Sequence, residues 1–345
     1  MAHDMKAVAF TRHLPIDEPD ALHDIVLPRP QPGPRDLLVR VEAVSVNPVD
    51  AKLRGPKPGA PAQLDLPRIL GFDAAGVVEA VGAEVELFQP GDEVYYAGDV
   101  TRSGSNAQFH LVDERVVGRK PTTLDFAQAA ALPLTTITAW ELLFDRMPYS
   151  IDMEGNARTL LVIAGAGGVG SIAIQLARHA GFTVIATASR AETVDWCKKM
   201  GADHVIDHRQ PLAPQLASLG FTQVDAVLNL ADTDRYWEAI GEIVAPLGHV
   251  GLIVEPSGLL KIGDPYKAKS VGIHWEMMFA RARFKTPDMI EQHRLLNRVA
   301  SLVDAGALRS THTETLGTIN AANLREVHRR LESGKTIGKL VLVGW

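Results

Sequence analysis

The spacing of apolar positions changes once along the chain. Up to about residue 125, short segments alternate apolar and polar side chains; in 36–47, Leu37, Val39 and Val41 share one face while Arg40 lies on the other. Glycine and proline separate these segments, as in LPRPQPGPRD. The pattern predicts an irregular β domain.

From about residue 126, continuous apolar runs alternate with segments of helical period. The run 159–164 precedes a helical pattern that ends at Gly181, and the runs 183–189, 224–230 and 249–254 continue the rhythm. Apolar strands separated by helices indicate a parallel sheet that is buried on both faces. The chain is therefore predicted to be an α/β protein with a doubly wound parallel sheet and a separate β domain.

Composition excludes several classes of protein. The 345 residues are 46% hydrophobic and carry a formal net charge of −6, so we expect no nucleic-acid partner. No apolar run approaches the length of a membrane span, and the N-terminal residues do not resemble a signal peptide, so we expect no membrane association and a cytoplasmic protein. The single cysteine, Cys197, excludes an intramolecular disulfide and a Cys-rich zinc site.

A glycine-rich turn, VIAGAGGVG, joins the first apolar strand of the α/β region to its first helix. In this setting Gly165 permits a tight turn, Gly167 lets the backbone approach a pyrophosphate, and Gly170 lets the helix pack near the strand. The helix start also favours an anion. The predicted cofactor-binding residues of this turn are Gly165, Ala166, Gly167, Gly168, Val169 and Gly170.

The end of the second strand bears on which dinucleotide binds. An NAD site places an acidic residue about 20 residues beyond the motif. In this chain Ser189 and Arg190 stand there, and neither is acidic. A hydroxyl and a guanidinium suit the 2′-phosphate of NADP(H), so we predict NADP(H). His208, after the third strand, is a further candidate near the adenosine. The alternative is that Arg190 and His208 are solvated surface residues.

Several stretches together resemble the medium-chain dehydrogenase/reductase superfamily, and more closely its zinc-free quinone oxidoreductase-like branch. The resemblance implies a GroES-like β domain formed by 1–130 and 285–345 and a Rossmann domain formed by 131–284. The stretches are SVNPVDAKLRG (45–55), LGFDAAGVVEAVG (70–82), FQPGDEVYYAG (88–98), AALPLTTITAWELL (130–143) and the closing GKLVLVG.

Zinc enzymes of this superfamily hold their catalytic metal with Cys, His and Cys, and the matching positions differ here. Asn47 stands at the first cysteine, Phe72 at the histidine and Leu134 at about the second cysteine. Asp73 alone cannot form a site of three protein ligands, so we predict no metal.

Without a Lewis acid, a conjugated substrate is easier to reduce than a simple carbonyl. Hydride addition to an enone or a quinone gives delocalised charge that modest hydrogen bonding stabilises. The resemblance likewise implies an NADPH-dependent reductase of quinones or α,β-unsaturated carbonyl compounds. Two alternatives stay open: a catalytically weak NADPH-binding sensor or scaffold, and an alcohol dehydrogenase.

The resemblance also implies catalytic candidates in both domains. Asn47 is placed to orient nicotinamide or to donate to the substrate oxygen, and Thr138 matches a threonine near nicotinamide. Lys52, where many relatives have tyrosine, is a candidate proton donor. Each has a plain alternative: a turn residue, a packed helix residue and a solvent-facing lysine. We expect Asp50 and Arg54 to form an ion pair.

The remaining predictions concern the cofactor and the oligomer. Ile253 and Val254 end the fifth strand, where the family approaches nicotinamide, and Lys339 of the closing Gly-Lys is predicted to reach the cofactor. Segments 52–66, 98–106 and 277–287 should shape the substrate pocket. An apolar patch on the last strand of the α/β domain predicts a homodimer, with a wall of the substrate cleft or ordinary core as the alternative; its residues are Trp275, Met277, Met278 and Phe279.

Overall fold

A computed structural model describes residues 4–152 and 157–345 of the chain. It divides into two compact units, one formed by Met1–Leu134 with Phe279–Trp345 and the other by Thr135–Met278. The second unit is thus four residues shorter at its start and six at its end than the range 131–284 predicted from sequence.

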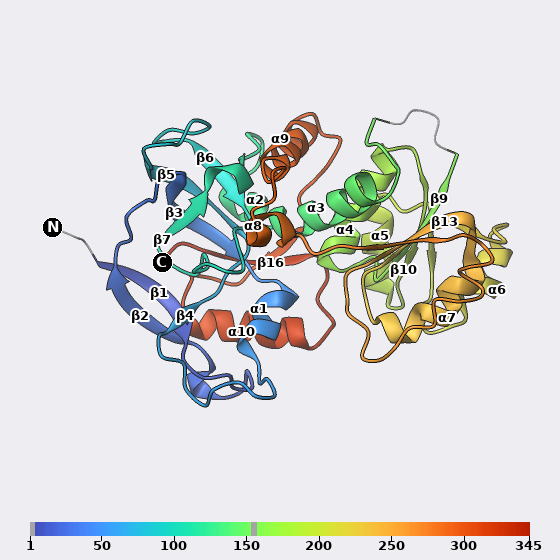
Figure 1. The fold of residues 1–345 in the computed structure, drawn as a ribbon, viewed down its shortest axis with the longest axis horizontal. Coiled ribbons are helices and arrows are strands. Elements are labelled where there is room, and N and C mark those ends of the chain that lie inside the picture. The colour runs from blue at the N-terminus through green and yellow to red at the C-terminus, as the bar shows by residue number, and fades with distance from the viewer. Residues whose placement is uncertain (1–3, 153–156) are drawn as a thin grey trace. The chain divides into compact units, whose positions relative to one another are not determined.

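The second unit is built on a six-stranded parallel sheet (Figure 1). Its strand order, β11-β10-β9-β12-β13-β14, corresponds to the order 3-2-1-4-5-6 of a Rossmann fold, which confirms the predicted doubly wound sheet. The strands and helices are β9 (Thr159–Ile163), α4 (Gly168–His179), β10 (Thr183–Thr187), α5 (Ala191–Met200), β11 (His204–Ile206), α6 (Leu212–Ser218), β12 (Val224–Asn229), α7 (Thr233–Ile243), β13 (Val244–Leu252) and β14 (Gly272–Trp275), preceded by a π-helix at Glu141–Arg146.

Burial of apolar side chains explains this arrangement. Leu160 to Ile163 of β9 and Ala226 to Leu228 of β12 are completely buried, as expected of central strands covered on both faces. Helix α5 ends at Gly201, whose φ of 107° is left-handed and favours glycine. In the described part of the chain, no helix is both long and apolar enough to cross a membrane.

The first unit contains the predicted irregular β domain (Figure 1). A seven-stranded sheet runs in the order β15-β16-β3-β5-β6-β8, with β7 also paired to β3, and a second sheet has the order β2-β1-β4. The elements are β1 (Asp4–Phe10), β2 (His23–Pro28), β3 (Asp36–Ser45), α1 (Pro48–Arg54), β4 (Arg68–Ile69), β5 (Ala74–Val81), β6 (Glu93–Tyr96), β7 (Phe109–Asp113), β8 (Val117–Arg119), α2 (Phe126–Ala130), α8 (Ala280–Phe284), α9 (Glu291–Asp304), β15 (His312–Thr315), α10 (Ala321–Glu332) and β16 (Lys339–Val343), with 3₁₀ helices at Pro19–Ala21 and Glu114–Val116; α3 (Pro133–Trp140) contains the boundary between the units.

Strand register in the large sheet brings the ends of three neighbouring strands together. β16 pairs antiparallel with β3 through Val341 and Ser45, and β3 pairs antiparallel with β5 through Val44 and Ala74. The start of β16, the end of β3 and the start of β5 therefore lie together. The polar cluster described below lies at these strand ends.

Candidate active site

The glycine-rich turn joins β9 to α4, as predicted. A Cβ on Gly170 would lie 2.4 Å from the carbonyl oxygen of Ala164, so only glycine fits there. A Cβ on Gly165 would lie 2.8 Å from the Cβ of Ala186, which means that this glycine lets the turn pack on β10. Close packing therefore accounts for both residues.

Gly167 differs from the other two because the space beside it is open. A Cβ there would approach no heavy atom closer than 3.5 Å, which leaves room for a ligand group. The left-handed residue of the turn is Ala164, with a φ of 64°. Thr187 holds it: the Thr187 hydroxyl accepts a hydrogen bond from the Ala164 N–H at 3.0 Å. Sequence reasoning missed Thr187 as a support of the turn.

Ser189 and Arg190 lie just after β10, from which Ala188 separates them, as the sequence predicts. Arg190 lies at the start of α5, and its Nε donates to the Glu192 carboxylate at 2.6 Å. Both side chains of this pair are substantially exposed, so the pair itself is weakly stabilising and an anionic ligand can compete for the guanidinium. The Ser189 carbonyl accepts a hydrogen bond from Arg209 at 3.0 Å.

Arginine side chains gather around His208, which follows β11. Partial burial lowers the pKa of His208; Asp207 opposes this, while Arg235, Arg209 and Arg190 lower the pKa further. The backbone carbonyl of His208 also accepts a hydrogen bond from Arg235. Sequence reasoning found Arg190 and His208 but missed Arg209 and Arg235. Arg209 adjoins His208 in the chain, but only the folded strands bring it to the Ser189 carbonyl and bring Arg235 to His208.

The remaining predicted residues of the second unit lie on separate elements. Thr138 is buried in α3. Ile253 and Val254 follow β13 and are half-buried, and the Val254 carbonyl accepts a hydrogen bond from Thr233 at 2.5 Å. Their contact with a cofactor stays a prediction.

A buried polar cluster lies in the first unit where β16 begins, β3 ends and β5 begins. The Lys339 ammonium donates to the Asn47 Oδ1 at 2.5 Å and to the Val46 carbonyl at 2.9 Å, and lies 3.0 Å from the Asp73 Oδ2. Asn47 Nδ2 donates to the same Asp73 oxygen at 2.8 Å. Lys339 is 3% exposed, and Asn47 and Asp73 are completely buried. The structure therefore joins two predicted site residues through Asp73.

Asp73 and Asp50 are two buried carboxyl groups of this cluster. Burial raises the pKa of Asp73, against the effect of Lys339 and of hydrogen bonds from Asn47 and the Leu134 N–H. Burial also raises the pKa of Asp50 to about 7, although the N–H groups of Asn47 and Gly71 donate to its two oxygens. The buried negative charge thus exceeds the positive charge when both carboxyls are ionised.

The predicted ion pair between Asp50 and Arg54 is wrong. Asp50 accepts from two backbone N–H groups, whereas the guanidinium of Arg54 binds Glu332 of α10 and the Leu14 carbonyl. On α1 the two residues are four positions apart, but the carboxylate turns back to the start of the helix. Local backbone donors therefore win over the helical pair.

The donor set at the metal-ligand positions does not suit zinc. Asn47 is bonded to Asp73 and Lys339, Phe72 packs edge-to-face on Phe279 with ring centroids 5.2 Å apart, and Leu134 is apolar. An ammonium, which cannot ligate a metal, lies among these groups. Within 4–152 and 157–345, no group of three or more His, Cys, Asp or Glu residues could hold a metal ion.

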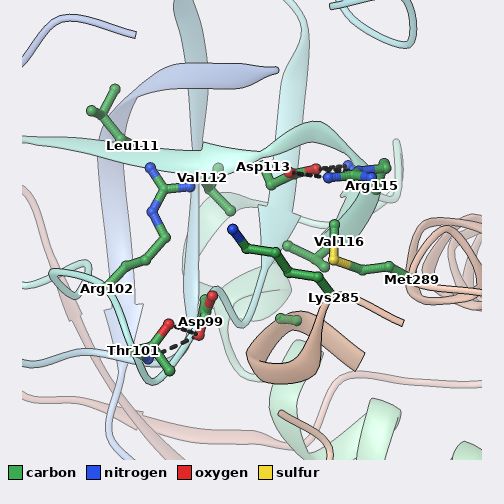
Figure 2. Close-up of a pocket in the computed structure, with 11 residues that line it drawn as sticks. Asp99, Thr101, Arg102, Leu111, Val112, Asp113, Arg115, Val116, Lys285 and Met289 are labelled. Carbon is green, nitrogen blue, oxygen red and sulfur yellow. Dashed lines mark hydrogen bonds and ion pairs between the residues drawn. The ribbon is translucent and has the colours of Figure 1, made fainter. Parts of the chain in front are cut away.

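Two cavities among the described residues of the first unit bear on the predictions. One, of about 380 Å³, is lined by Lys52 together with Arg54 and Glu332, so the lysine faces a cavity and is exposed. The other, of about 330 Å³, brings residues of 98–106 and 277–287 together, and Figure 2 shows Lys285 pointing into it between Arg102 and the Arg115–Asp113 pair. This second cavity contains none of the predicted site residues.

The apolar patch predicted on the last Rossmann strand is only partly exposed. Trp275 and Met277 are about half exposed, at 47% and 49%. Met278 is buried, and Phe279 belongs to the first unit, where it packs on Phe72. The prediction that all four residues form one surface is therefore wrong, because the chain enters the other unit at this point.

Two family models match the chain. The alcohol dehydrogenase GroES-like domain matches residues 33–133, and the zinc-binding dehydrogenase domain matches residues 200–342. A zinc-type alcohol dehydrogenase-like protein of Staphylococcus aureus is 41% identical over 98% of this chain and 99% of its own length. A 2-methylene-furan-3-one reductase of Solanum lycopersicum is 37% identical over 59% of this chain and 52% of its own length.

Solved structures show the same architecture. A candidate zinc-dependent alcohol dehydrogenase from Rhizobium etli superposes with a TM-score of 0.93 at 51% identity, covering 100% of this chain and 99% of that one. A mycobacterial quinone oxidoreductase gives 0.81 at 30% identity, covering 98% and 99%. A mycobacterial protein complexed with NADPH gives 0.81 at 28% identity, covering 98% and 99%.

The fold and these matches define an oxidoreductase of the medium-chain dehydrogenase/reductase superfamily. Within it, the chain belongs to the family of zinc-type alcohol dehydrogenase-like proteins. The predicted resemblance and its two-domain fold class are confirmed.

Proposed function

We propose that this protein is an NADPH-dependent reductase of quinones or other α,β-unsaturated carbonyl compounds that works without a metal. The observation that carries the proposal is the donor set at the family's zinc positions. An amide, a phenyl ring and an isobutyl group stand there, and the nearby cation is the ammonium of Lys339. A substrate whose developing charge is spread over a conjugated system suits such a site.

The arginine side chains near His208 support NADPH as the cofactor. Arg190, Arg209 and Arg235 all lower the pKa of His208, so they contribute a positive field beyond the ends of β10 and β11, which Asp207 opposes. A 2′-phosphate carries more negative charge than a ribose hydroxyl and gains more from this field. The absence of an acidic residue at positions 187–190 removes the usual partner of an NAD ribose.

The similar proteins support the same reaction class. The tomato relative is named as a reductase of a conjugated furanone, the mycobacterial structure as a quinone oxidoreductase, and another neighbour was solved with NADPH. Each name describes that protein. Together they favour reduction of a conjugated carbonyl over oxidation of a simple alcohol for this chain.

The chain's own residues have separable tasks in this proposal. Bound NADPH would supply a hydride, which adds to the β carbon of an enone and moves the electron pair onto the carbonyl oxygen. The glycine turn would bind the pyrophosphate, with Gly167 giving room for it. Asn47 and Thr138 would orient the reacting groups, Ile253, Val254 and Lys339 would lie near the cofactor, and Lys52 or water would return the proton.

Steady-state assays with the purified protein test the proposal. NADPH oxidation is followed with 1,4-naphthoquinone, 9,10-phenanthrenequinone and short enones. NADH replaces NADPH in one comparison, and NADP⁺ with simple alcohols is the other. We expect turnover with NADPH and at least one conjugated acceptor. NADPH binding without any turnover would instead identify a sensor or scaffold, and alcohol oxidation would identify an alcohol dehydrogenase.

We also propose a homodimer, with Trp275 and Met277 in its interface. Both are half-exposed apolar side chains at or next to β14, an edge strand of the six-stranded sheet. Sedimentation velocity should give twice the mass of one chain, and Trp275→Asp should shift the protein toward the monomer. A wild-type monomer at all concentrations would refute this proposal.

A further inference from the structure

We infer that Lys339 is a positioning residue that, with Asp73, fixes the orientation of the Asn47 side-chain amide. The inference rests on the proposed function for its catalytic consequence. It differs from the predicted contact between Lys339 and the cofactor, because Lys339 here acts through Asn47. Three facts carry it: the hydrogen bonds of the cluster, its burial and the strand ends that form it.

The hydrogen bonds permit one orientation of the amide. An ammonium has three donors and no acceptor, and an ionised carboxylate accepts and cannot donate. Lys339 therefore requires the Asn47 oxygen on its side, and Asp73 requires the Asn47 nitrogen on its own. The hydrogen bonds at the Asp73 side chain are ones that its carboxylate accepts, which is the pattern of the ionised form.

The ammonium donors of this clamp are all matched. The three Lys339 donors face three acceptors, namely the Asn47 amide oxygen, the Val46 carbonyl and the Asp73 carboxylate. With these residues buried, water cannot replace a lost partner. Turning the amide by half a rotation would face its N–H groups toward the ammonium and its oxygen toward the carboxylate. Both contacts would be repulsive.

The sheet makes the clamp rigid. Lys339 begins β16, Asn47 follows β3 and Asp73 precedes β5, three neighbouring strands. The backbone N–H of Asn47 donates to the Asp50 carboxylate at 2.8 Å. Asn47 is therefore held at both its main chain and its side chain. The second Nδ2 hydrogen has only the distant Phe72 carbonyl at 3.5 Å. The amide thus has a set donor side and a set acceptor side.

A neutral double variant separates positioning from folding. Lys339→Met alone leaves a buried carboxylate without its cation and is expected to destabilise the protein. In Lys339→Met/Asp73→Asn, the charges leave together, and the new amide at position 73 can donate to Asn47 only if the Asn47 amide turns around. Lys339→Arg keeps the cation, and Lys6→Met makes the same change at an exposed lysine.

The expected result is a folded double variant with impaired turnover. Its thermal unfolding midpoint should lie well above that of Lys339→Met, while kcat falls by about 10- to 100-fold. A larger primary isotope effect with 4-deuterated NADPH should accompany that fall. Lys339→Arg should recover part of kcat, and Lys6→Met should equal the wild type. Wild-type kcat in the folded double variant would overturn the inference.

An activity-independent measurement keeps the inference separate from the proposed function. The side-chain amide resonances of Asn47, identified by their loss in Asn47→Asp, are recorded by ¹H–¹⁵N NMR. A single slowly exchanging pair that shifts in the double variant and not in Lys6→Met supports the fixed amide, even if wild-type protein reduces no quinone. A rapidly exchanging pair in wild type would overturn it.

Discussion

Asp50 is a buried carboxyl group to which no cation is bonded within the described part of the chain. Its two oxygens accept N–H bonds from Asn47 and Gly71, while Lys339 acts on it only through space and Asp73 repels it. Backbone donors compensate part of the lost hydration, but burial still raises the pKa of Asp50 to about 7. This single residue therefore couples folding to pH.

Asp50 should make the protein less stable as pH rises toward neutrality. The unfolded carboxyl titrates near 3.8 and the folded one near 7, so the folded state holds the extra proton between these values. Its stabilising contribution is complete below the lower value and is lost as pH rises through the upper one. Urea unfolding at several pH values should show this loss in wild type and a flatter profile in Asp50→Asn. Equal slopes would contradict the raised pKa.

The arginine side chains near His208 give a second prediction at this scale. Arg190→Ala and Arg209→Ala should each weaken NADPH binding by about 10- to 100-fold and leave NADH binding unchanged, because only NADPH carries the 2′-phosphate. Arg178→Ala is the control, since Arg178 is an exposed arginine that pairs with Asp203. Fluorescence titration measures both cofactors, and equal losses for NADPH and NADH would refute recognition of the phosphate.

At the scale of elements, the turn between β9 and α4 assigns different work to its glycines. Gly170 is required for packing, because a side chain there would enter the backbone of Ala164 and Gly165. Gly167 has open space and is not needed for that packing. The same glycine motif therefore contains a residue for folding and a residue for the ligand.

Two matched alanine substitutions should separate these roles. Gly170→Ala should lower the free energy of unfolding by about 3 kcal/mol through steric overlap. Gly167→Ala should change the free energy of unfolding by about 1 kcal/mol or less. It should nevertheless weaken NADPH binding at least as strongly as Gly170→Ala does, when the Gly170→Ala affinity is measured on its folded fraction. Denaturant unfolding and cofactor titration measure the two effects. A Gly170→Ala protein as stable as Gly167→Ala would contradict the packing argument.

The periodic features of the elements could be predicted from sequence, whereas contacts between distant segments could not. Apolar runs and the glycine turn gave the Rossmann sheet, because strand burial and helix packing leave a local pattern. Lys339 and Asn47 are 292 positions apart in the chain, and only the register of β16 on β3 brings them together. Arg54 was misassigned for the same reason: its partner Glu332 lies on α10.

At the scale of the whole molecule, family membership and site chemistry give different expectations about zinc. The names of the similar proteins include zinc, and the fold over both units is that of the family. The residues at the ligand positions are nevertheless an amide, an aromatic ring and an aliphatic chain, and Cys197 is buried in the other unit. The same fold can thus carry different groups at the ligand positions.

Metal analysis of the intact protein tests this difference. We expect zinc well below one equivalent per chain after purification and no loss of NADPH–quinone activity after treatment with a strong chelator, because a buried ammonium takes the place of the cation. Adding zinc back should not raise the rate. The Lys339→Met/Asp73→Asn variant should not gain zinc either, since the ligand positions still lack imidazole and thiolate. Finding one tightly bound zinc per chain, with turnover abolished when it is removed, would refute the metal-free mechanism. It would also refute the view that the Lys339 ammonium is the cation of this site.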